Sequence, residues 1–191
     1  MELFGCKSFD ELIAYNCAPV LVGIKVANLL CMKMTDLEEI DAAIAMYNAQ
    51  FDKRGLVFRR MCFCSKRALL LVYNKEKLAK ILRNKGYRAY LVACGYPAKA
   101  TMEEDLAILE THLKETAGFP HEIGVFLGYP LEDVLGFVLH KGEKSKYTGY
   151  WKVYGDVKKA KNLFACYEHY RDYILKKLSE GMPLELAVSK F

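Results

Sequence analysis

Apolar segments of two different periods alternate along this chain, and the alternation limits the folds that it can adopt. The clearest helical segment spans 35–55, where apolar residues recur every three or four positions: Leu37, Ile40, Ile44, Tyr47 and Phe51. Two strand-like runs follow, 56–64 and 68–73, and only Ser65-Lys66-Arg67 separates them. We therefore predict a helix and then a β-hairpin in the first half of the chain.

Residues that typically begin and end helices divide the rest of the chain. Capping boxes are formed by Ser8 with Glu11, Thr35 with Glu38, and Thr101 with Glu104. Asn74 predicts a helix over 75–85, Asp156 begins a long helix that Gly181 ends, and Pro183 begins a short terminal one.

The N-terminal region leaves two interpretations open. We expect Cys17-Ala18-Pro19 to end the first helix near Asn16, because proline disfavours the helix interior. The apolar segment 20–32 is then either a second, buried helix or, over 20–24, a buried strand, since periodicity does not separate the two in a short run.

Further strand-like segments lie at 87–94, 122–127 and 150–154. The first two are each followed by Gly-Tyr-Pro, which indicates either a repeated strand–turn–helix unit or a chance recurrence. Together these patterns predict an α/β or α+β fold in a single domain over residues 1–191. It would hold one mixed sheet of about five strands flanked by helices, with a helical N-terminal segment.

Composition narrows the location of the protein. The longest apolar stretch, 18–32, is interrupted by Lys25, so we predict no transmembrane span. The first residues lack the charged and apolar regions of a secretory signal, which indicates a cytoplasmic protein. Seven cysteines, an odd number at irregular spacing, are expected to be free thiols.

The sequence lacks the P-loop, GxGxxG, HExxH and GxSxG motifs, which excludes the commonest nucleotide-binding, zinc-protease and hydrolase sites. One catalytic hypothesis remains, with Cys17 as nucleophile near a helix N-terminus, His121 as base, and Glu122, Asp133 or Asp156 as the group that orients the imidazole. The structural alternative is a buried Cys17 at a turn. Whether the chain is an enzyme is left open.

Aromatic and basic residues suggest a binding site in the second half. Tyr150, Trp151 and Lys152 share a strand-like segment, and Tyr129 lies in the Gly-Tyr-Pro turn that follows His121. Rings beside lysines bind planar or anionic ligands such as a flavin, a haem or a nucleotide. The alternative is an edge strand with aromatic packing, and the identity of any cofactor stays unknown.

Charge is unevenly distributed, with 13 Lys/Arg against 2 Asp/Glu in 52–99 and 1 against 8 in 100–140. The basic segment 58–99 indicates either a nucleic-acid-binding face or a region neutralised by the acidic segment.

Cys62 and Cys64 share one face of a strand, but a CxC pair with scattered histidines is a weak zinc pattern. We therefore predict no metal site.

Three segments resemble an uncharacterised bacterial family that carries only a domain-of-unknown-function label. They are Asn16-Cys17-Ala18-Pro19 with the Gly23-x-Lys25 and Ala27-Asn28-Leu29 that follow, 119–130 (FPHEIGVFLGYP), and 149–155 (GYWKVYG). The resemblance implies a cytoplasmic bacterial protein without an established activity. It draws attention to Cys17, His121, Glu122, Tyr150, Trp151 and Lys152, and it adds Lys25 to the expected ligand-binding residues.

The leading functional prediction is a protein that binds a small ligand or cofactor between the His121/Gly-Tyr-Pro turn and the Tyr150–Lys152 segment. The alternatives are a cysteine-dependent enzyme using Cys17 and His121, and a nucleic-acid-binding protein using 58–99. The ligand-binding prediction and the cysteine-dependent-enzyme alternative both depend on Cys17 and His121 meeting at one cleft. The sequence does not indicate an oligomeric state.

Overall fold

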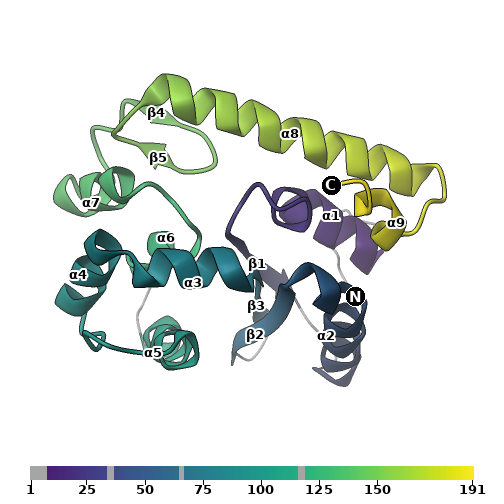
Figure 1. The fold of residues 1–191 in the computed structure, drawn as a ribbon, viewed down its shortest axis with the longest axis horizontal. Helices are drawn as coiled ribbons and strands as arrows, with labels where there is room; N and C mark the ends of the chain where they lie inside the picture. Colours follow the sequence, from purple (N-terminus) through teal and green to yellow (C-terminus); the bar gives the residue numbers. More distant parts are fainter. Residues whose placement is uncertain (1–7, 34–36, 65–66, 116–118) are drawn as a thin grey trace. The chain divides into compact units, whose positions relative to one another are not determined.

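The computed structural model describes residues 8–33, 37–64, 67–115 and 119–191. The chain divides into two compact units, the first comprising residues 1–75 with 167–191 and the second comprising residues 76–166. The first unit is thus built from both ends of the chain and the second from its middle. Figure 1 shows the helices and strands of both units.

A three-stranded antiparallel sheet forms the centre of the first unit. Its strands β1 (Ala27–Lys33), β2 (Leu56–Cys64) and β3 (Arg67–Asn74) lie in the spatial order β1-β3-β2. The predicted hairpin is confirmed as β2 and β3. The residues Leu70–Tyr73 of the central strand are buried whichever face they occupy, which explains their uninterrupted apolar sequence.

Helices cover this sheet. They are α1 (Phe9–Leu21), α2 (Leu37–Phe51) and the short α9 (Leu184–Val188). The predicted helix over 35–55 is confirmed as α2, a 3₁₀ turn η1 (Asp52–Arg54) and Gly55 in the left-handed region at φ 65°. The capping box of Thr35 and Glu38 lies outside the described residues.

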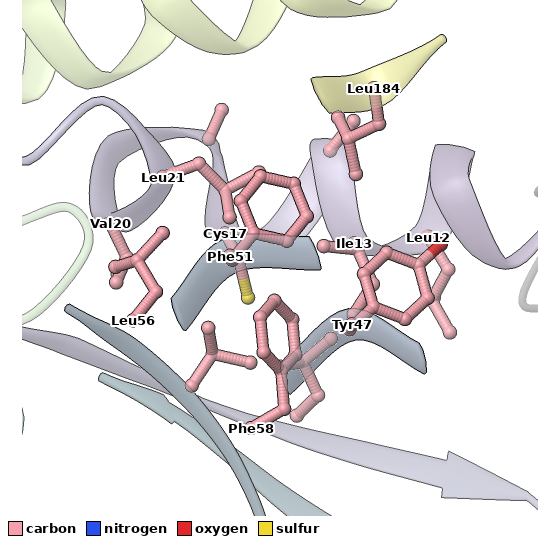
Figure 2. Close-up of a cluster of buried hydrophobic side chains, with 14 of the residues drawn as sticks. Leu12, Ile13, Cys17, Val20, Leu21, Tyr47, Phe51, Leu56, Phe58 and Leu184 are labelled. Atoms are coloured by element: carbon pink, nitrogen blue, oxygen red, sulfur yellow. The ribbon is translucent and has the colours of Figure 1, made fainter. Parts of the chain in front are cut away.

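The core of the first unit gathers between α1, α2, α9 and one face of the sheet (Figure 2). Aromatic rings dominate it: Tyr47 lies 5.2 Å from Phe58 and 6.1 Å from Phe51, measured between ring centroids. Phe51 and Phe58 are at most 1% exposed. Figure 2 shows the Cys17 sulfur within this apolar cluster.

Both predictions for residues 17–32 are wrong. Helix α1 continues through Cys17 and Pro19 to Leu21, and 27–33 forms β1. Because Pro19 has no backbone N–H, α1 lacks one hydrogen bond near its end. The burial of the apolar side chains of Val20 and Leu21, which are at most 1% exposed, stabilises the helix by more than that loss. The partner of β1 is β3, about forty residues later, so local periodicity carried no sign of the strand.

The second unit is mostly helical. It contains most of α3 (Lys75–Arg83), then α4 (Lys85–Ala93), α5 (Met102–Glu115), α6 (Ile123–Phe126) and α7 (Leu131–Leu139). A small hairpin of β4 (Tyr147–Thr148) and β5 (Lys152–Val153) follows, and α8 (Val157–Ser179) begins in this unit and ends in the first. Asp156 caps α8, since its carboxylate accepts the Lys159 N–H at 2.9 Å, and α9 follows Pro183 as predicted.

The strands predicted at 87–94 and 122–127 are wrong, because both segments are helical. Asn84 begins α4, its side chain accepting the Gly86 N–H at 2.9 Å. A β-carbon at Gly86 would lie 2.9 Å from the Leu131 side chain, so this glycine permits close packing rather than ending a helix. The predicted strand over 150–154 is present only as the two residues of β5.

The two Gly-Tyr-Pro sequences share one structure, a Schellman cap at a helix C-terminus. In the first, Tyr96 N–H donates to Leu91 O at 3.0 Å, and in the second, Tyr129 N–H donates to Gly124 O at 2.9 Å. Each glycine is left-handed, at φ 93° and 75°. The recurrence is therefore a repeated helix–turn–helix element, and not the strand–turn–helix unit that the sequence suggested.

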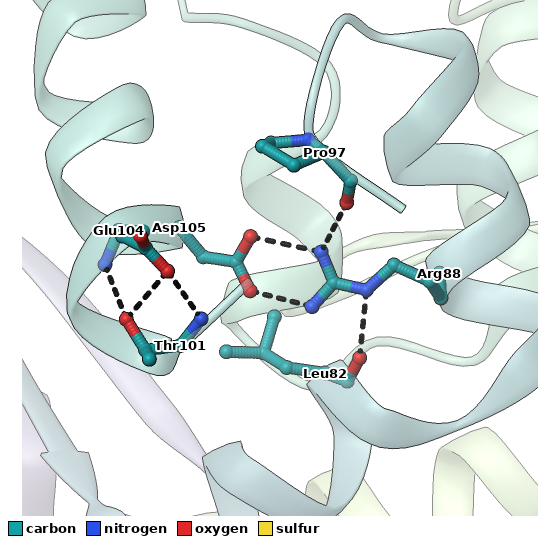
Figure 3. A network of polar contacts seen from close by, with 6 residues as sticks. All are labelled: Leu82, Arg88, Pro97, Thr101, Glu104 and Asp105. Atoms are coloured by element: carbon teal, nitrogen blue, oxygen red, sulfur yellow. Dashed lines mark hydrogen bonds and ion pairs between the residues drawn. The ribbon is translucent and has the colours of Figure 1, made fainter. Parts of the chain in front are cut away.

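Arg88 connects three segments of the second unit (Figure 3). Its guanidinium binds both carboxylate oxygens of Asp105, at 2.6 and 2.8 Å, and donates to Leu82 O and Pro97 O. Asp105 is fully buried. The capping box beside it is confirmed, because Thr101 and Glu104 exchange hydrogen bonds at the start of α5.

The fold is α+β, and the five strands of the described residues form two separate sheets instead of the predicted single mixed sheet. The small sheet is confined to the second unit. The single domain over residues 1–191 stays a prediction.

Candidate functional site

A hollow of about 250 Å³ opens in the first unit where the end of α1 meets η1. Its lining comes from four separate stretches of sequence: Val20, Leu21, Val22, Gly23, Arg54, Leu56, Asn74 and Phe191. Val20, Leu21 and Leu56 are buried by at least 97%, so they form a fixed apolar wall. Arg54 and Asn74 add the polar side chains.

Arg54 is held in place at this hollow. Its Nη2 donates to Leu21 O at 3.2 Å and to Phe191 O at 3.1 Å. Its own carbonyl accepts the Asn74 amide at 3.4 Å. The Nε atom of Arg54 is buried and has no hydrogen-bond partner among the described residues, which is unusual for a buried donor.

A second polar group lies on the same unit, formed by Cys17, Lys25 and Asn28. Lys25 is 6% exposed, and its Nζ donates to Asn28 Oδ1 at 2.5 Å. Burial lowers the pKa of the Lys25 ammonium to about 8. The structure thus joins two residues that the sequence proposed for different roles, Cys17 for catalysis and Lys25 for ligand binding.

The surroundings of Cys17 disfavour a thiolate. The side chain is fully buried, and burial raises the pKa of the thiol to about 12 against the smaller lowering effects of Lys25 and Asn28. The prediction that Cys17 precedes a helix N-terminus is wrong, because it lies in the second half of α1. The helix dipole therefore does not stabilise a thiolate there.

His121 belongs to the second unit, and its exposed ring packs edge-to-face on Phe137 at 5.3 Å. Cys17 belongs to the first unit, so a cleft shared by the two residues stays a prediction. Glu122, expected to orient His121, instead contacts His112: the Nδ1···Oε1 distance is 2.5 Å. Tyr96 donates to the same oxygen at 3.5 Å.

The charge of the Glu122 carboxylate affects three neighbouring side chains, in each case less than their burial does. Glu122 is 6% exposed, and together with the larger effect of burial its charge raises the pKa of Tyr90, Cys94 and Tyr96. His112 was not singled out as a partner of Glu122. One signal was available, since His112 follows Leu109 by three positions on the flank of the apolar stripe of α5.

The predicted aromatic site is partly assembled. Tyr129 stacks on Trp151 at a centroid distance of 4.8 Å, and Phe164 meets Trp151 edge-on at 4.5 Å. Lys152 donates to Gly142 O at 2.6 Å. The faces of Tyr129 and Trp151 thus pack on each other, whereas Tyr150 remains 37% exposed. Ligand binding at these residues stays a prediction.

Asp133 holds this aromatic group to the backbone. Its Oδ2 accepts the Trp151 indole N–H at 2.7 Å, and its Oδ1 accepts the backbone N–H groups of Tyr154 and Gly155 at 2.7 and 2.8 Å. Asp133 is 3% exposed. Three donors converge on one buried carboxylate, which gives it a structural role that the sequence did not reveal.

Two further predictions concern metals and nucleic acids. Within the described residues, no group of three or more His, Cys, Asp or Glu side chains is arranged to hold a metal ion. The side chains of Cys62 and Cys64 lie outside the described part of the chain.

In the basic segment, Arg60 pairs with Asp41 at 3.1 Å and Arg88 pairs with Asp105, so part of the positive charge of this segment is neutralised within the protein.

A family model described as "Protein of unknown function (DUF3793)" matches residues 13–187. The chain belongs to the DUF3793 family. The match includes the apolar wall of the hollow, Arg54, Lys25 and Cys17, and the Glu122–His112 pair. Comparison with curated proteins and with solved structures gives no match.

None of the helices in the described ranges combines the length and apolar character that crossing a membrane requires.

Proposed function

We propose that this DUF3793 protein binds a small molecule in the hollow of its first unit. The observation that carries the proposal is the hollow itself, an opening with a buried apolar wall and a few fixed polar groups. Sites for small molecules typically have this composition. The class of function is the one that the sequence favoured, but its location differs from the predicted His121–Trp151 region.

The size of the hollow restricts the ligand. At about 30 Å³ for each water molecule, 250 Å³ corresponds to roughly eight waters. We therefore expect a ligand of about that many non-hydrogen atoms, or one group of a larger molecule. A whole flavin or haem is too large for this volume.

A library of small polar and apolar compounds tests the proposal, with binding followed by thermal shift and by methyl NMR. Val22→Phe fills the hollow from its rim, where Val22 is 9% exposed. Val138→Phe adds the same atoms to a more exposed valine of the second unit. Ligands should bind the wild type and Val138→Phe but not Val22→Phe. Equal binding to Val22→Phe would exclude the hollow as the site.

A second candidate function is acid–base chemistry at Glu122 and His112. If Nδ1 of His112 carries the ring hydrogen and donates a hydrogen bond to the buried Glu122 carboxylate, Nε2 is left as a proton acceptor. The imidazole is partly exposed, so a substrate can reach it. A screen of hydrolase and isomerase substrates tests it. His112→Gln and Glu122→Gln should each lower turnover by a factor of about 100 or more. Activity unaffected by both variants would reject this candidate.

The other sequence-based hypotheses remain proposals with less support. A Cys17 nucleophile requires an opening of the core and loss of activity in Cys17→Ser. Nucleic-acid binding through 58–99 requires affinity that falls steeply with salt. A ligand at Tyr129, Tyr150 and Lys152 should quench the fluorescence of Trp151.

A further inference from the structure

We infer that the outer face of helix α7 docks onto an anionic membrane surface, with its apolar side chains entering the lipid and the lysines that follow contacting the headgroups. The inference goes beyond the proposed function and does not depend on the hollow of the first unit. It rests on the exposed side chains of α7, on the charge at its C-terminal end and on the conformation of the next loop.

The outer face of α7 is apolar. Leu135, Val138 and Leu139 are 44%, 39% and 75% exposed, and spacings of three and four residues place them on one side of the helix. Asp133 and Gly136, on the other side, are buried. Three of the ten large apolar residues that the described ranges expose thus lie within five consecutive positions. Apolar residues gathered in this way indicate an interaction site, whereas single ones do not.

Positive charge follows directly at the C-terminal end of this face. The segment 141–146 contains three lysines and one glutamate, and the side chains of Lys141 and Lys144 are exposed. Neither of these lysines forms an ion pair within the described ranges. The acidic Glu132 lies in the first turn of α7, at the opposite end from Leu139. The most exposed leucine is therefore next to the basic end of the helix.

The backbone keeps the lysines beside this end. Lys141 N–H donates to Val138 O at 3.2 Å and Gly142 N–H to Phe137 O at 2.8 Å, so the chain turns immediately after α7. Lys141 at φ 51° and Lys144 at φ 56° are the non-glycine residues with positive φ in the described ranges. Lysine seldom adopts this conformation, and such outliers concentrate where a function requires them.

A lipid surface fits these features better than another protein copy does. Helices that adsorb to membranes combine an apolar face with flanking lysines, and the lysines are attracted to anionic headgroups. Lipid also accepts projecting side chains without a groove of matching shape. A second copy on the same face would form a two-fold interface and bring the lysines of both copies together, which like charge opposes. Docking through the end near Leu139 keeps Glu132 away from the headgroups.

Sedimentation with lipid vesicles tests the inference. The wild type should bind an equal mixture of phosphatidylcholine and phosphatidylglycerol more tightly than phosphatidylcholine alone, and the binding should weaken as salt is added. Leu139→Gln should lower the partition coefficient on the mixed vesicles about 10-fold or more, because the leucine no longer enters the lipid. Leu186→Gln changes a leucine of the first unit that is 56% exposed and should have no effect.

A second pair of variants tests the charge. Lys141→Gln with Lys144→Gln should weaken binding to the mixed vesicles about 30-fold, at about fivefold for each lysine. Lys80→Gln with Lys85→Gln removes the same charge from two exposed lysines of the basic segment and should leave binding within about twofold of the wild type at physiological salt. Circular dichroism checks that each variant is folded. The comparison of the two vesicle types on the wild type needs no variant.

Several results would overturn the inference. One is equal binding of the wild type to both vesicle types, and another is binding that Leu139→Gln leaves unchanged. Equal losses from the two lysine pairs would show that charge acts without regard to α7. If the wild type binds no vesicles but self-associates, and Leu139→Gln abolishes the association, the face is an interface between copies. Neither vesicle binding nor self-association would leave an acidic protein as the occupant.

Discussion

Asp133 and Trp151 provide the sharpest test of how the second unit is held together. In Asp133→Asn, the amide oxygen can keep the two backbone N–H groups that Oδ1 accepts, but the amide nitrogen then faces the indole N–H of Trp151. One hydrogen bond to a charged group is lost, and a buried donor is left opposite another donor. We expect a loss of about 3 kcal/mol in the free energy of unfolding.

The double-mutant cycle with Trp151→Phe isolates this effect. Phenylalanine removes the indole donor, so Trp151→Phe should cost less in the Asp133→Asn background than in the wild type. The expected coupling is about 1.5–3 kcal/mol, the contribution of a hydrogen bond to a charged acceptor. Glu143→Gln, on an exposed neighbouring loop, serves as the control and should change stability by no more than about 0.5 kcal/mol.

Urea unfolding is the assay. Trp151 is the only tryptophan of the chain, so its fluorescence reports on the second unit, and far-UV circular dichroism follows the variants that lack it. If Asp133→Asn unfolds within about 0.5 kcal/mol of the wild type, or if the coupling is below that value, the three-donor arrangement does not contribute as argued.

Three further predictions address other buried groups. The pKa of Lys25, about 8, lies below its ordinary 10.5, so the folded state binds fewer protons than the unfolded chain above pH 8 and stability rises with pH. This rise, roughly 0.5–1 kcal/mol between pH 8 and 9, should vanish in urea unfolding of Lys25→Met; an unchanged rise would show that Lys25 is not its source. Thiol labelling at pH 8 should modify the exposed Cys31 quickly and Cys17 only as fast as the protein unfolds, and rapid labelling of Cys17 would contradict its burial. Asp105→Asn leaves Arg88 without its buried counter-ion and should cost about 3 kcal/mol in thermal unfolding, whereas a loss below about 1 kcal/mol would contradict that account.

Local signals predicted the starts of α5 and α8 and the end of the helical segment that contains α2 and η1. The capping box of Thr101 and Glu104, the cap of Asp156 and the left-handed Gly55 each act between residues three or four apart, so the sequence alone reveals them. The hairpin of β2 and β3 is equally local. These elements were predicted correctly because neighbours in sequence determine them.

The errors arose where distant contacts decide the structure. The segment 87–94 has the aromatic and branched residues of a strand, yet Arg88 within it bonds Leu82, Pro97 and Asp105 from a helix. Such contacts have no local signature, and propensity is easily overridden by them. The same reason explains why five predicted strands were assigned to one sheet.

The candidate site was the least predictable part. The hollow draws on residues from the two ends of the first unit, and Arg54 was one of the thirteen basic residues in 52–99. Of the residues that line the hollow, only Gly23 lies in one of the three segments that resemble the family of unknown function. Glu122 was predicted as an orienting carboxylate, but its imidazole partner is His112, because the short helix α6 and not a strand presents it.

The discontinuity of the first unit has a consequence for translation. Its apolar core includes Leu184, Ala187 and Val188 from α9, which leave the ribosome after the entire second unit. Until then the nascent chain exposes α1 and the sheet without this cover, while the helices of residues 76–166 already have their own local contacts. Domains usually fold as units and from the N-terminus during synthesis; in this chain the middle can mature before the beginning.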